Sequence, residues 1–449
     1  MRYTPHTPLD KAEMLQAIGF GRIEELFEHV PEFLRKQAGI SLPPGLSEVA
    51  VKKRMAALAS RNATPVEWRF FLGGGIYHHH IPSTVDAIIS RAEFATSYTP
   101  YQPEVSQGTL QAMYEFQTLI CQLTGMEVAN AGLYDGASAT AEAVLMVRRL
   151  QKEGRNRVFL SRSLHPHYRS VVATYVRGLE NLELVEVPYG ESGALDVRFL
   201  SQELDQTAAC VVVGYPNFFG VIEDLTPVRE ICARSGALLV TATSEPLSLA
   251  LIKPPGGWGA DISVGEGQSL GIPMSLGGPG FGFFACHKRY VRSMPGRLVG
   301  ETVDGDGRRG FVLTLSTREQ HIRREKATSN ICTSQSLCTL AATVFMSTLG
   351  KAGMRRLATI NFQRAHETRD RLVNEAGLGP VFSAPFFNEF VVRSNNLDQL
   401  LARSTAASVI PGVPLGHWYP ELEGCVLVCV TEMNEREEIE QLVRLFRAD

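Results

Sequence analysis

Residues 98–108, with the sequence YTPYQPEVSQG, carry the densest group of side chains able to bind a ligand. Phenol, hydroxyl, amide and carboxylate groups follow one another there, while Pro100 and Pro103 stiffen the backbone and exclude regular helix. Polar groups on a stiff loop are suited to recognition, although a solvated connector is the alternative. The candidates for a recognition surface are Tyr98, Tyr101, Gln102, Glu104, Ser106 and Gln107.

Residues 73–80 combine glycines with the consecutive histidines His78, His79 and His80. Glycines permit a close approach of the backbone, and histidine is a common metal ligand. Consecutive side chains on an extended chain point to opposite faces, so these imidazoles cannot converge on one ion without unusual geometry. We therefore expect no metal site in this segment.

Residues 130–143 run from a glycine-containing turn into an alanine-rich helix. The first N–H groups of a helix have no partner within it, and the hydroxyls of Ser138 and Thr140 are close in sequence. Such a helix start can bind a phosphate group. It can equally be an ordinary capped helix end, so the residues alone leave two interpretations open.

The glycines from Gly277 to Gly282 give a loose match to a dinucleotide-binding fingerprint, completed by Ala285. That fingerprint needs a strand before the glycines and a helix that opens directly on them. Residues 283–286 instead continue as an apolar strand. We therefore reject dinucleotide binding.

The elements that must position these groups alternate between short apolar runs and helical stretches from about residue 128 to residue 286. Strands are predicted at residues 157–160, 184–187, 210–213 and 237–240, and helices at residues 137–151, 166–176, 197–204 and 227–234. Alternation of this kind predicts an α/β domain with a mostly parallel sheet sandwiched by helices.

The two ends of the chain follow other patterns. Residues 1–60 read as a helical arm, in which Asp10 and Glu13 resemble a capping box. Residues 61–330 form the predicted large domain, and residues 331–449 supply linking helices and a small C-terminal α+β domain. The expected parts of this last region are helices at 334–349 and 354–375, interrupted at Gly350 and Gly353, strands at 387–392 and 426–430, and a terminal helix from Glu435. Because no long linker separates the two domains, we expect them to form one rigid body.

The composition is that of an ordinary soluble protein. The chain has 449 residues, a hydrophobic content of 44% and a formal net charge of −3, which gives no electrostatic basis for binding nucleic acid. We find no signal peptide and no apolar run near the roughly 18 residues of a membrane span, so we expect a cytoplasmic protein. The cysteines form no CxxC pair and are typical of reduced core thiols. A redox role for Cys332 or Cys338 is left open.

Residues 318–326 carry charges of both signs at helical spacing, directly before residues 328–333 with the sequence TSNICT. Mixed charges of this kind are typical of a solvated face or of an interface laced with ion pairs. We favour an interface between subunits.

Three segments together resemble one family. Residues 98–108, residues 128–131 and residues 318–333 are similar to the glycine cleavage system P-protein, glycine decarboxylase. The similarity extends over nearly the whole chain, and the length matches subunit 1, which corresponds to the amino-terminal half when the enzyme is split in two. The resemblance implies an α/β fold of the fold-type-I pyridoxal-phosphate transferase kind.

In that architecture, residues 261–280 resemble the place of the Schiff-base lysine, yet no lysine occurs between Ala260 and Cys286. An imine needs a primary amine, which neither the Gln268 amide nor the Ser269 hydroxyl provides. The resemblance also places Thr241 where an aspartate would meet the pyridinium nitrogen, and a neutral threonine cannot match that charge. The implied degenerate cofactor pocket comprises Ser138 at the phosphate, His165 at the ring, Thr241, Gln268 and Ser269.

The resemblance implies that this chain holds no covalent pyridoxal phosphate, has no catalytic residue of its own and is inactive alone. A homologous subunit 2 would hold the cofactor in an α2β2 assembly, which decarboxylates glycine and transfers the aminomethyl group to the lipoyl arm of H-protein. Residues 98–107 would complete the partner's pocket. Two alternatives stay open, namely a free-standing pyridoxal-phosphate aminotransferase or lyase that uses Lys253, Lys288 or Lys326, and a non-catalytic binding or regulatory subunit.

Overall fold

The computed structural model describes residues 5–39, 41–151, 154–275 and 277–447. The chain divides into two compact units, Met1–Ala63 and Thr64–Asp449. The linking helices and the C-terminal segment therefore share one compact unit with the large domain.

The first unit contains the helices α1 (Pro8–Ala17), α2 (Glu32–Gln37) and α3 (Glu48–Ala59), none of which has a buried residue. Its first helix cap is not the predicted pair of Asp10 and Glu13. The Thr7 hydroxyl accepts a hydrogen bond from the Asp10 amide at 3.2 Å, and the Asp10 carboxylate accepts one from the Thr7 amide at 2.6 Å. Pro8 follows at the first helical position, where its missing N–H leaves no hydrogen bond unmade, so the helix starts earlier than predicted.

The second unit is built on a seven-stranded sheet with the order β2-β8-β7-β6-β5-β3-β4. Its strands are β2 (Val128–Ala129), β3 (Arg157–Ser161), β4 (Glu183–Val187), β5 (Ala208–Gly214), β6 (Leu238–Thr243), β7 (Ile262–Glu266) and β8 (Gly282–Cys286). Strands β3 to β7 pair in parallel, whereas β8 is antiparallel to β7 and to β2. The predicted mostly parallel sheet is confirmed.

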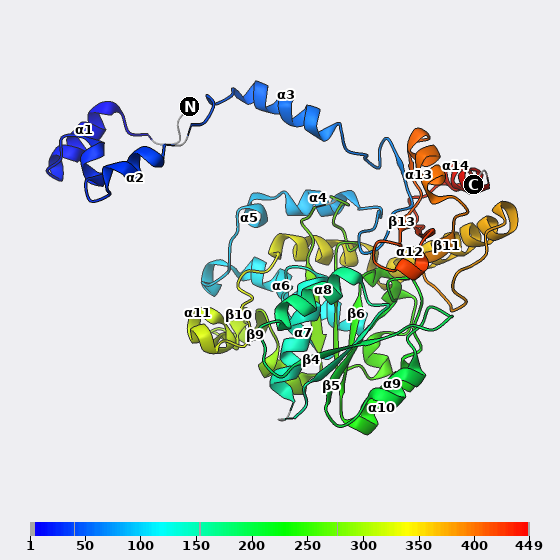
Figure 1. The fold of residues 1–449 in the computed structure, drawn as a ribbon. Helices are drawn as coiled ribbons and strands as arrows, with labels where there is room; N and C mark the ends of the chain where they lie inside the picture. The colour runs from blue at the N-terminus through cyan, green and yellow to red at the C-terminus, as the bar shows by residue number, and fades with distance from the viewer. Residues whose placement is uncertain (1–4, 40, 152–153, 276, 448–449) are drawn as a thin grey trace. The chain divides into compact units, whose positions relative to one another are not determined.

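Both faces of the sheet are buried, because successive side chains of a strand point to opposite sides. In β5, Val211 and Val213 pack in one core and Cys210 and Val212 in the other. The helices α6 (Gln107–Thr124), α9 (Val197–Glu203) and α10 (Leu225–Ser235) contribute to the first core, and α7 (Gly136–Leu150) and α8 (Pro166–Val176) to the second (Figure 1). This double burial is the reason that the strands read as continuous apolar runs.

The C-terminal part begins with α12 (Ser336–Ala376), in which Gly350 has φ 60° and ψ 179°. This break confirms the predicted interruption at Gly350, where glycine tolerates the positive φ without strain. Gly353, predicted as a second interruption, lies within the helix. A three-stranded antiparallel sheet follows, with the order β11-β14-β13. Its strands are β11 (Glu389–Arg393), β13 (Val413–Pro414) and β14 (Cys425–Cys429). Strands β11 and β14 share a core with α13 (Leu397–Ala406) and α14 (Arg436–Arg447).

Among the described residues, α12 is the one helix whose length and apolar composition would suffice to cross a membrane. Half of its most apolar window is buried inside the protein. Ala341, Ala342 and Phe345 of this helix belong to the core beneath the large sheet. Its apolar character therefore has a structural cause in this fold.

Candidate functional site

Gln268 ties the loop after β7 to the segment at residues 73–80, which contains glycines and histidines. The Gln268 Oε1 accepts a hydrogen bond from the Tyr77 amide at 2.8 Å, and Nε2 donates to the carbonyl groups of Ile272 at 2.7 Å and Tyr77 at 3.1 Å. The side chain is buried. Every polar atom of the amide is thus used to hold the backbone, within the stretch of residues 261–280 where the family resemblance placed a lysine.

Ser269 contacts a buried group of charged side chains. Its hydroxyl donates to Glu245 Oε1 at 2.7 Å, and Glu245 Oε2 lies 2.9 Å from His79 Nε2. The other ring nitrogen of His79 lies 2.9 Å from Glu432 Oε2. Burial opposes protonation of His79, but the two carboxylates outweigh it and raise its pKa to about 10. Burial raises the pKa of Glu432, yet His79 and the backbone donors lower it overall to about 2.

This group, Glu245, His79 and Glu432, is an ion triad rather than a metal site. The imidazolium bridges the large sheet region and the C-terminal segment, and it keeps two buried carboxylates compensated. Among the residues that the structure describes, no group of three or more His, Cys, Asp or Glu side chains is arranged to hold a metal ion.

The start of α7, proposed above as either a phosphate seat or a helix cap, is occupied by carboxylates. Asp135 is the N-cap, and its Oδ1 accepts a hydrogen bond from the Ser138 amide at 2.7 Å. The Ser138 hydroxyl donates back to the Asp135 carbonyl at 3.1 Å. Glu266, at the end of β7, accepts from the Gly136 amide at 2.9 Å. Two of the N–H groups that a phosphate could use, those of Gly136 and Ser138, are therefore bound within the chain.

His165 precedes α8 and is buried. Its Nε2 lies 2.8 Å from the Gly74 carbonyl, and its Nδ1 accepts a hydrogen bond from the His167 amide at 3.1 Å. The ring stacks on Tyr168 with a centroid distance of 4.7 Å. Burial lowers the pKa of His165 to about 4, so the imidazole is neutral near pH 7. Both nitrogens and one ring face are engaged within the protein.

Thr241 lies fully buried on β6, opposite Ser263 on β7. Neither hydroxyl oxygen has a hydrogen-bond partner among the described residues. The hydroxyl of Thr241 carries no charge, so it cannot supply the carboxylate that a pyridinium nitrogen would require.

Residues 98–107, the predicted recognition surface, are held in place by Arg297, which belongs to no sequence motif. Arg297 is buried, and its guanidinium donates to Thr99 Oγ1 at 3.1 Å and to Tyr101 Oη at 3.2 Å. Its Nε lies 3.5 Å from Glu319 Oε2. Arg297 therefore joins residues 98–107 to residues 318–326, two segments singled out separately in the sequence. Nothing in the local sequence around Arg297 signals this role, because its partners are remote along the chain.

The side chains of residues 98–107 differ in what they can reach. Tyr98 is 76% exposed and Tyr101 is 53% exposed, and Gln102 and Glu104 also lie on the surface. Gln107 is used internally, since its amide bonds both backbone groups of Phe311, at 2.8 and 2.9 Å. Phe311 belongs to the hairpin of β9 (Leu298–Val303) and β10 (Arg309–Thr314), so Gln107 anchors this hairpin. Ser106 is partly exposed beside it.

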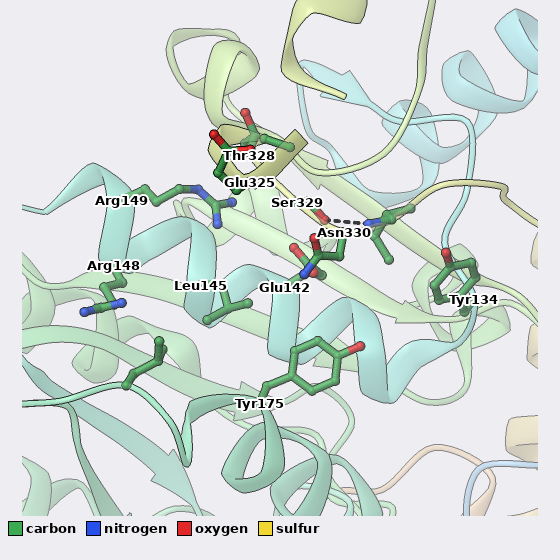
Figure 2. Close-up of a pocket in the computed structure, with 13 residues that line it drawn as sticks. Tyr134, Glu142, Leu145, Arg148, Arg149, Tyr175, Glu325, Thr328, Ser329 and Asn330 are labelled. Carbon is green, nitrogen blue, oxygen red and sulfur yellow. Dashed lines mark hydrogen bonds between the residues drawn. The ribbon is translucent and has the colours of Figure 1, made fainter. Parts of the chain in front are cut away.

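A cavity of about 840 Å³ opens beside the same charged segment. Figure 2 shows Glu142 and Arg149 of α7, Tyr175 of α8 and the loop at residues 325–330 around it. Glu142 is 3% exposed, and its Oε2 has no hydrogen-bond partner among the described residues. Burial raises the pKa of this carboxyl. A buried acid with one unpartnered oxygen therefore faces the cavity.

Solved structures with low sequence identity share this architecture. A cysteine desulfurase from Thermococcus onnurineus is 14% identical with a TM-score of 0.63, covering 87% of this chain and 97% of that chain. A sphingosine-1-phosphate lyase of Burkholderia pseudomallei is 15% identical with a TM-score of 0.67, covering 93% and 94%. The protein thus has the fold-type-I architecture of pyridoxal-phosphate-dependent enzymes, as predicted.

Closer similarities define the family. The model of the glycine cleavage system P-protein family matches residues 1–446. A probable glycine dehydrogenase (decarboxylating) subunit 1 of Anaeromyxobacter dehalogenans is 50% identical over 99% of both chains, and that of Carboxydothermus hydrogenoformans is 47% identical over 100% of both. A crystal structure of the glycine decarboxylase P-protein in inhibitor-bound form is 42% identical with a TM-score of 0.91, covering 100% of both chains. The chain belongs to the glycine cleavage system P-protein family, and its predicted resemblance to subunit 1 is confirmed.

The residues of this chain do not fit pyridoxal phosphate, the cofactor that the fold implies. Gln268 and Ser269 offer no amine, and Thr241 offers no charge. The carboxylate of Glu266 already accepts the Gly136 amide at the helix start. No lysine, arginine or histidine is among the described residues that line the 360 Å³ cavity beside Gln268. We therefore assign no chemical step to a cofactor bound here.

Proposed function

We propose that this chain is the subunit of a glycine decarboxylase that does not anchor pyridoxal phosphate. It would work beside a homologous subunit 2 that holds the cofactor. The observation that carries the proposal is that this chain belongs to the family, yet its pocket has no lysine and Glu266 fills the start of its helix α7. The names of the relatives, which call them subunit 1, support the existence of a second subunit.

The pair would decarboxylate glycine in the cytoplasm as an α2β2 assembly and pass the aminomethyl group to the oxidised lipoyl arm of H-protein. Pyridoxal phosphate, when bound to the partner, supplies the electron sink for loss of CO2. This chain would complete the partner's pocket and shape the entrance for the lipoyl arm. Its isolated form would be inactive.

The surface suited to this task is formed by residues 98–107. Arg297 donates to the phenol oxygen of Tyr101, so that oxygen acts as an acceptor there and keeps its own proton for another partner. The half-exposed phenol is thus a preoriented donor at a surface. Glu104 adds an exposed carboxylate three residues further along the chain. These groups could orient glycine or exclude water in a shared site, without any covalent role.

The alternatives have less support. Lys253 lies with its Nζ 3.7 Å from the ring centroid of Trp258, engaged in a cation–π contact. No lysine lines the cavity at Gln268 among the described residues. A free-standing pyridoxal-phosphate enzyme would therefore need a different pocket.

The proposal is tested by glycine–bicarbonate exchange with each purified chain alone and with both together. We expect exchange only when the two chains are combined and co-purify. Full exchange by subunit 2 alone would favour a non-catalytic binding or regulatory subunit. Exchange by this chain alone would establish the free-standing enzyme and refute the proposal.

A further inference from the structure

We infer that the Glu266 carboxylate takes the place of a ligand phosphate at the start of α7. It thereby keeps this anion-binding position, called the seat below, closed in this chain. This inference rests on the proposed function, in which another chain holds the cofactor. The property that it concerns is the binding of anions by this chain alone.

The seat lies at the start of α7, a helix of 15 residues. The unpaired N–H groups and the positive end of the helix dipole favour an anion there. Gly136 and Ser138 contribute two of these N–H groups, and each donates to a carboxylate of the chain, the first to Glu266 and the second to Asp135. The electrostatic demand of the helix start is therefore met internally.

Glu266 is held through both of its oxygens. Oε2 accepts from the Gly136 amide at 2.9 Å, and Oε1 accepts from the Phe281 amide at 3.1 Å. Phe281 lies directly before β8 and Glu266 ends β7, so one carboxylate joins the helix start to two strands. Burial raises the pKa of Glu266 and outweighs the two amides, which lower it, so that the pKa lies at about 7. Even in its neutral form the carboxyl fills the same space.

Glycines around the helix start allow neighbouring groups to approach closely. A Cβ at Gly136 would clash with the Tyr168 hydroxyl, and one at Gly280 would lie 2.8 Å from Glu266 Oε1. The Gly280 backbone thus lies close against the Glu266 carboxylate, and the Gly136 backbone lies close against Tyr168. A tetrahedral oxyanion could enter only if the Glu266 side chain were absent.

The open space that remains beside the seat does not attract phosphate. The cavity of about 360 Å³ is lined by Glu266, Asp135 and Gln268, together with glycines and other neutral residues. Two carboxylates without a cation among the described lining residues repel a dianion. The same position that in a cofactor-binding relative would need a donor or a cation is here an acceptor.

The test titrates inorganic phosphate onto the full chain at constant ionic strength, with calorimetry and the thermal midpoint as readouts. Glu266→Ser should gain saturable phosphate binding, at least about tenfold tighter than any binding by the unmodified chain, and phosphate should raise its thermal midpoint. Glu266→Gln is the matched control. Its amide oxygen still fills the seat and can accept from the backbone, so we expect no binding.

Saturable binding of phosphate by the unmodified chain would overturn the inference, and so would a folded Glu266→Ser chain that binds none. If Glu266→Ser fails to fold, the unmodified chain and Glu266→Gln decide the matter, because both should remain unresponsive to phosphate. The exchange assay answers a separate question, since it reports the pair of subunits and this titration reports anion binding by one chain.

Discussion

Arg297 and Tyr101 contact each other in two ways, through a hydrogen bond of 3.2 Å from the guanidinium to the phenol oxygen and through a distance of 5.4 Å between Cζ and the ring centroid. A buried cation therefore fixes a half-exposed aromatic ring on the proposed shared surface. Glu319 lies 3.5 Å from the same guanidinium and balances its charge. The orientation of Tyr101 depends on a residue nearly 200 positions away in the sequence.

Replacing Arg297 with Lys should lower glycine–bicarbonate exchange by the reconstituted pair about tenfold, since an ammonium keeps the charge but cannot make the forked contacts to Thr99 and Tyr101. We expect the loss in kcat rather than in assembly. Arg309→Lys is a matched control, because Arg309 is an exposed arginine that also lies over an aromatic ring, that of Phe311 at 5.0 Å. Equal loss in both variants would show that the effect is not specific to Arg297.

Replacing Tyr101 or Glu104 with Ala should impair glycine-dependent CO2 release more than it impairs binding to subunit 2. Both side chains are exposed, so their removal leaves the core of this chain intact. Tyr101→Phe separates the ring from the hydroxyl of the tyrosine, because it keeps the ring and removes the hydroxyl that accepts from Arg297 and is free to donate. Steady-state kinetics and size-exclusion chromatography provide the two readouts. Unchanged kinetics in both alanine variants would refute the placement of the shared surface.

His79→Gln should lower the free energy of unfolding by about 3–5 kcal/mol, because Glu245 and Glu432 would lose their shared imidazolium. Urea denaturation measures the difference. His287→Gln is the control, since His287 is partly exposed and lies 3.4 Å from the exposed Glu127.

The contribution of the triad should also depend on pH in a defined direction. The pKa of His79 is raised from 6.5 to about 10 in the folded state, so its stabilising contribution is complete below pH 6.5 and is lost toward pH 10. The pKa of Glu432 is lowered from 4.5 to about 2, so its contribution is complete above pH 4.5 and is lost toward pH 2. The difference between the unmodified chain and His79→Gln should therefore be largest from pH 4.5 to 6.5. A difference that grows above pH 7 would contradict this assignment.

Glu142→Gln should stabilise the isolated chain at pH 8 by about 1 kcal/mol, because ionising a buried carboxyl without a full set of partners is unfavourable. The sign follows from its raised pKa, since the unmodified chain loses stability as pH rises above the ordinary value of 4.5. Glu230→Gln on the exposed side of α10 should have no such effect. Destabilisation by Glu142→Gln in urea titrations would show that the carboxylate is compensated after all.

The parts of the fold that sequence could predict are those in which local pattern and burial agree. Residues 210–213 are apolar on both faces, and they lie in the centre of β5. The helix predicted at residues 166–176 has the bounds of α8, because Pro166 favours the first helical position. The break at Gly350 was also visible, since glycine interrupts a helical pattern.

The parts that could not be predicted depend on contacts between distant segments. The hairpin of β9 and β10 has mixed polar character and is anchored by Gln107, 204 residues away from Phe311. Glu266 is the last residue of the apolar strand β7, and only its distance to the Gly136 amide shows that it fills the helix start. The capping box of α1 differs from the predicted pair because Thr7 and Asp10 fit the same motif as Asp10 and Glu13, three residues earlier in the chain.

The most direct test of the central claim is covalent trapping of the cofactor. The purified full chain and the reconstituted pair would each be incubated with pyridoxal phosphate, reduced with borohydride and analysed by peptide mass spectrometry. We predict stoichiometric pyridoxyl-lysine on subunit 2 alone, with none on this chain in either sample. Stoichiometric modification of Lys253, Lys288 or Lys326 in the isolated chain would contradict the account.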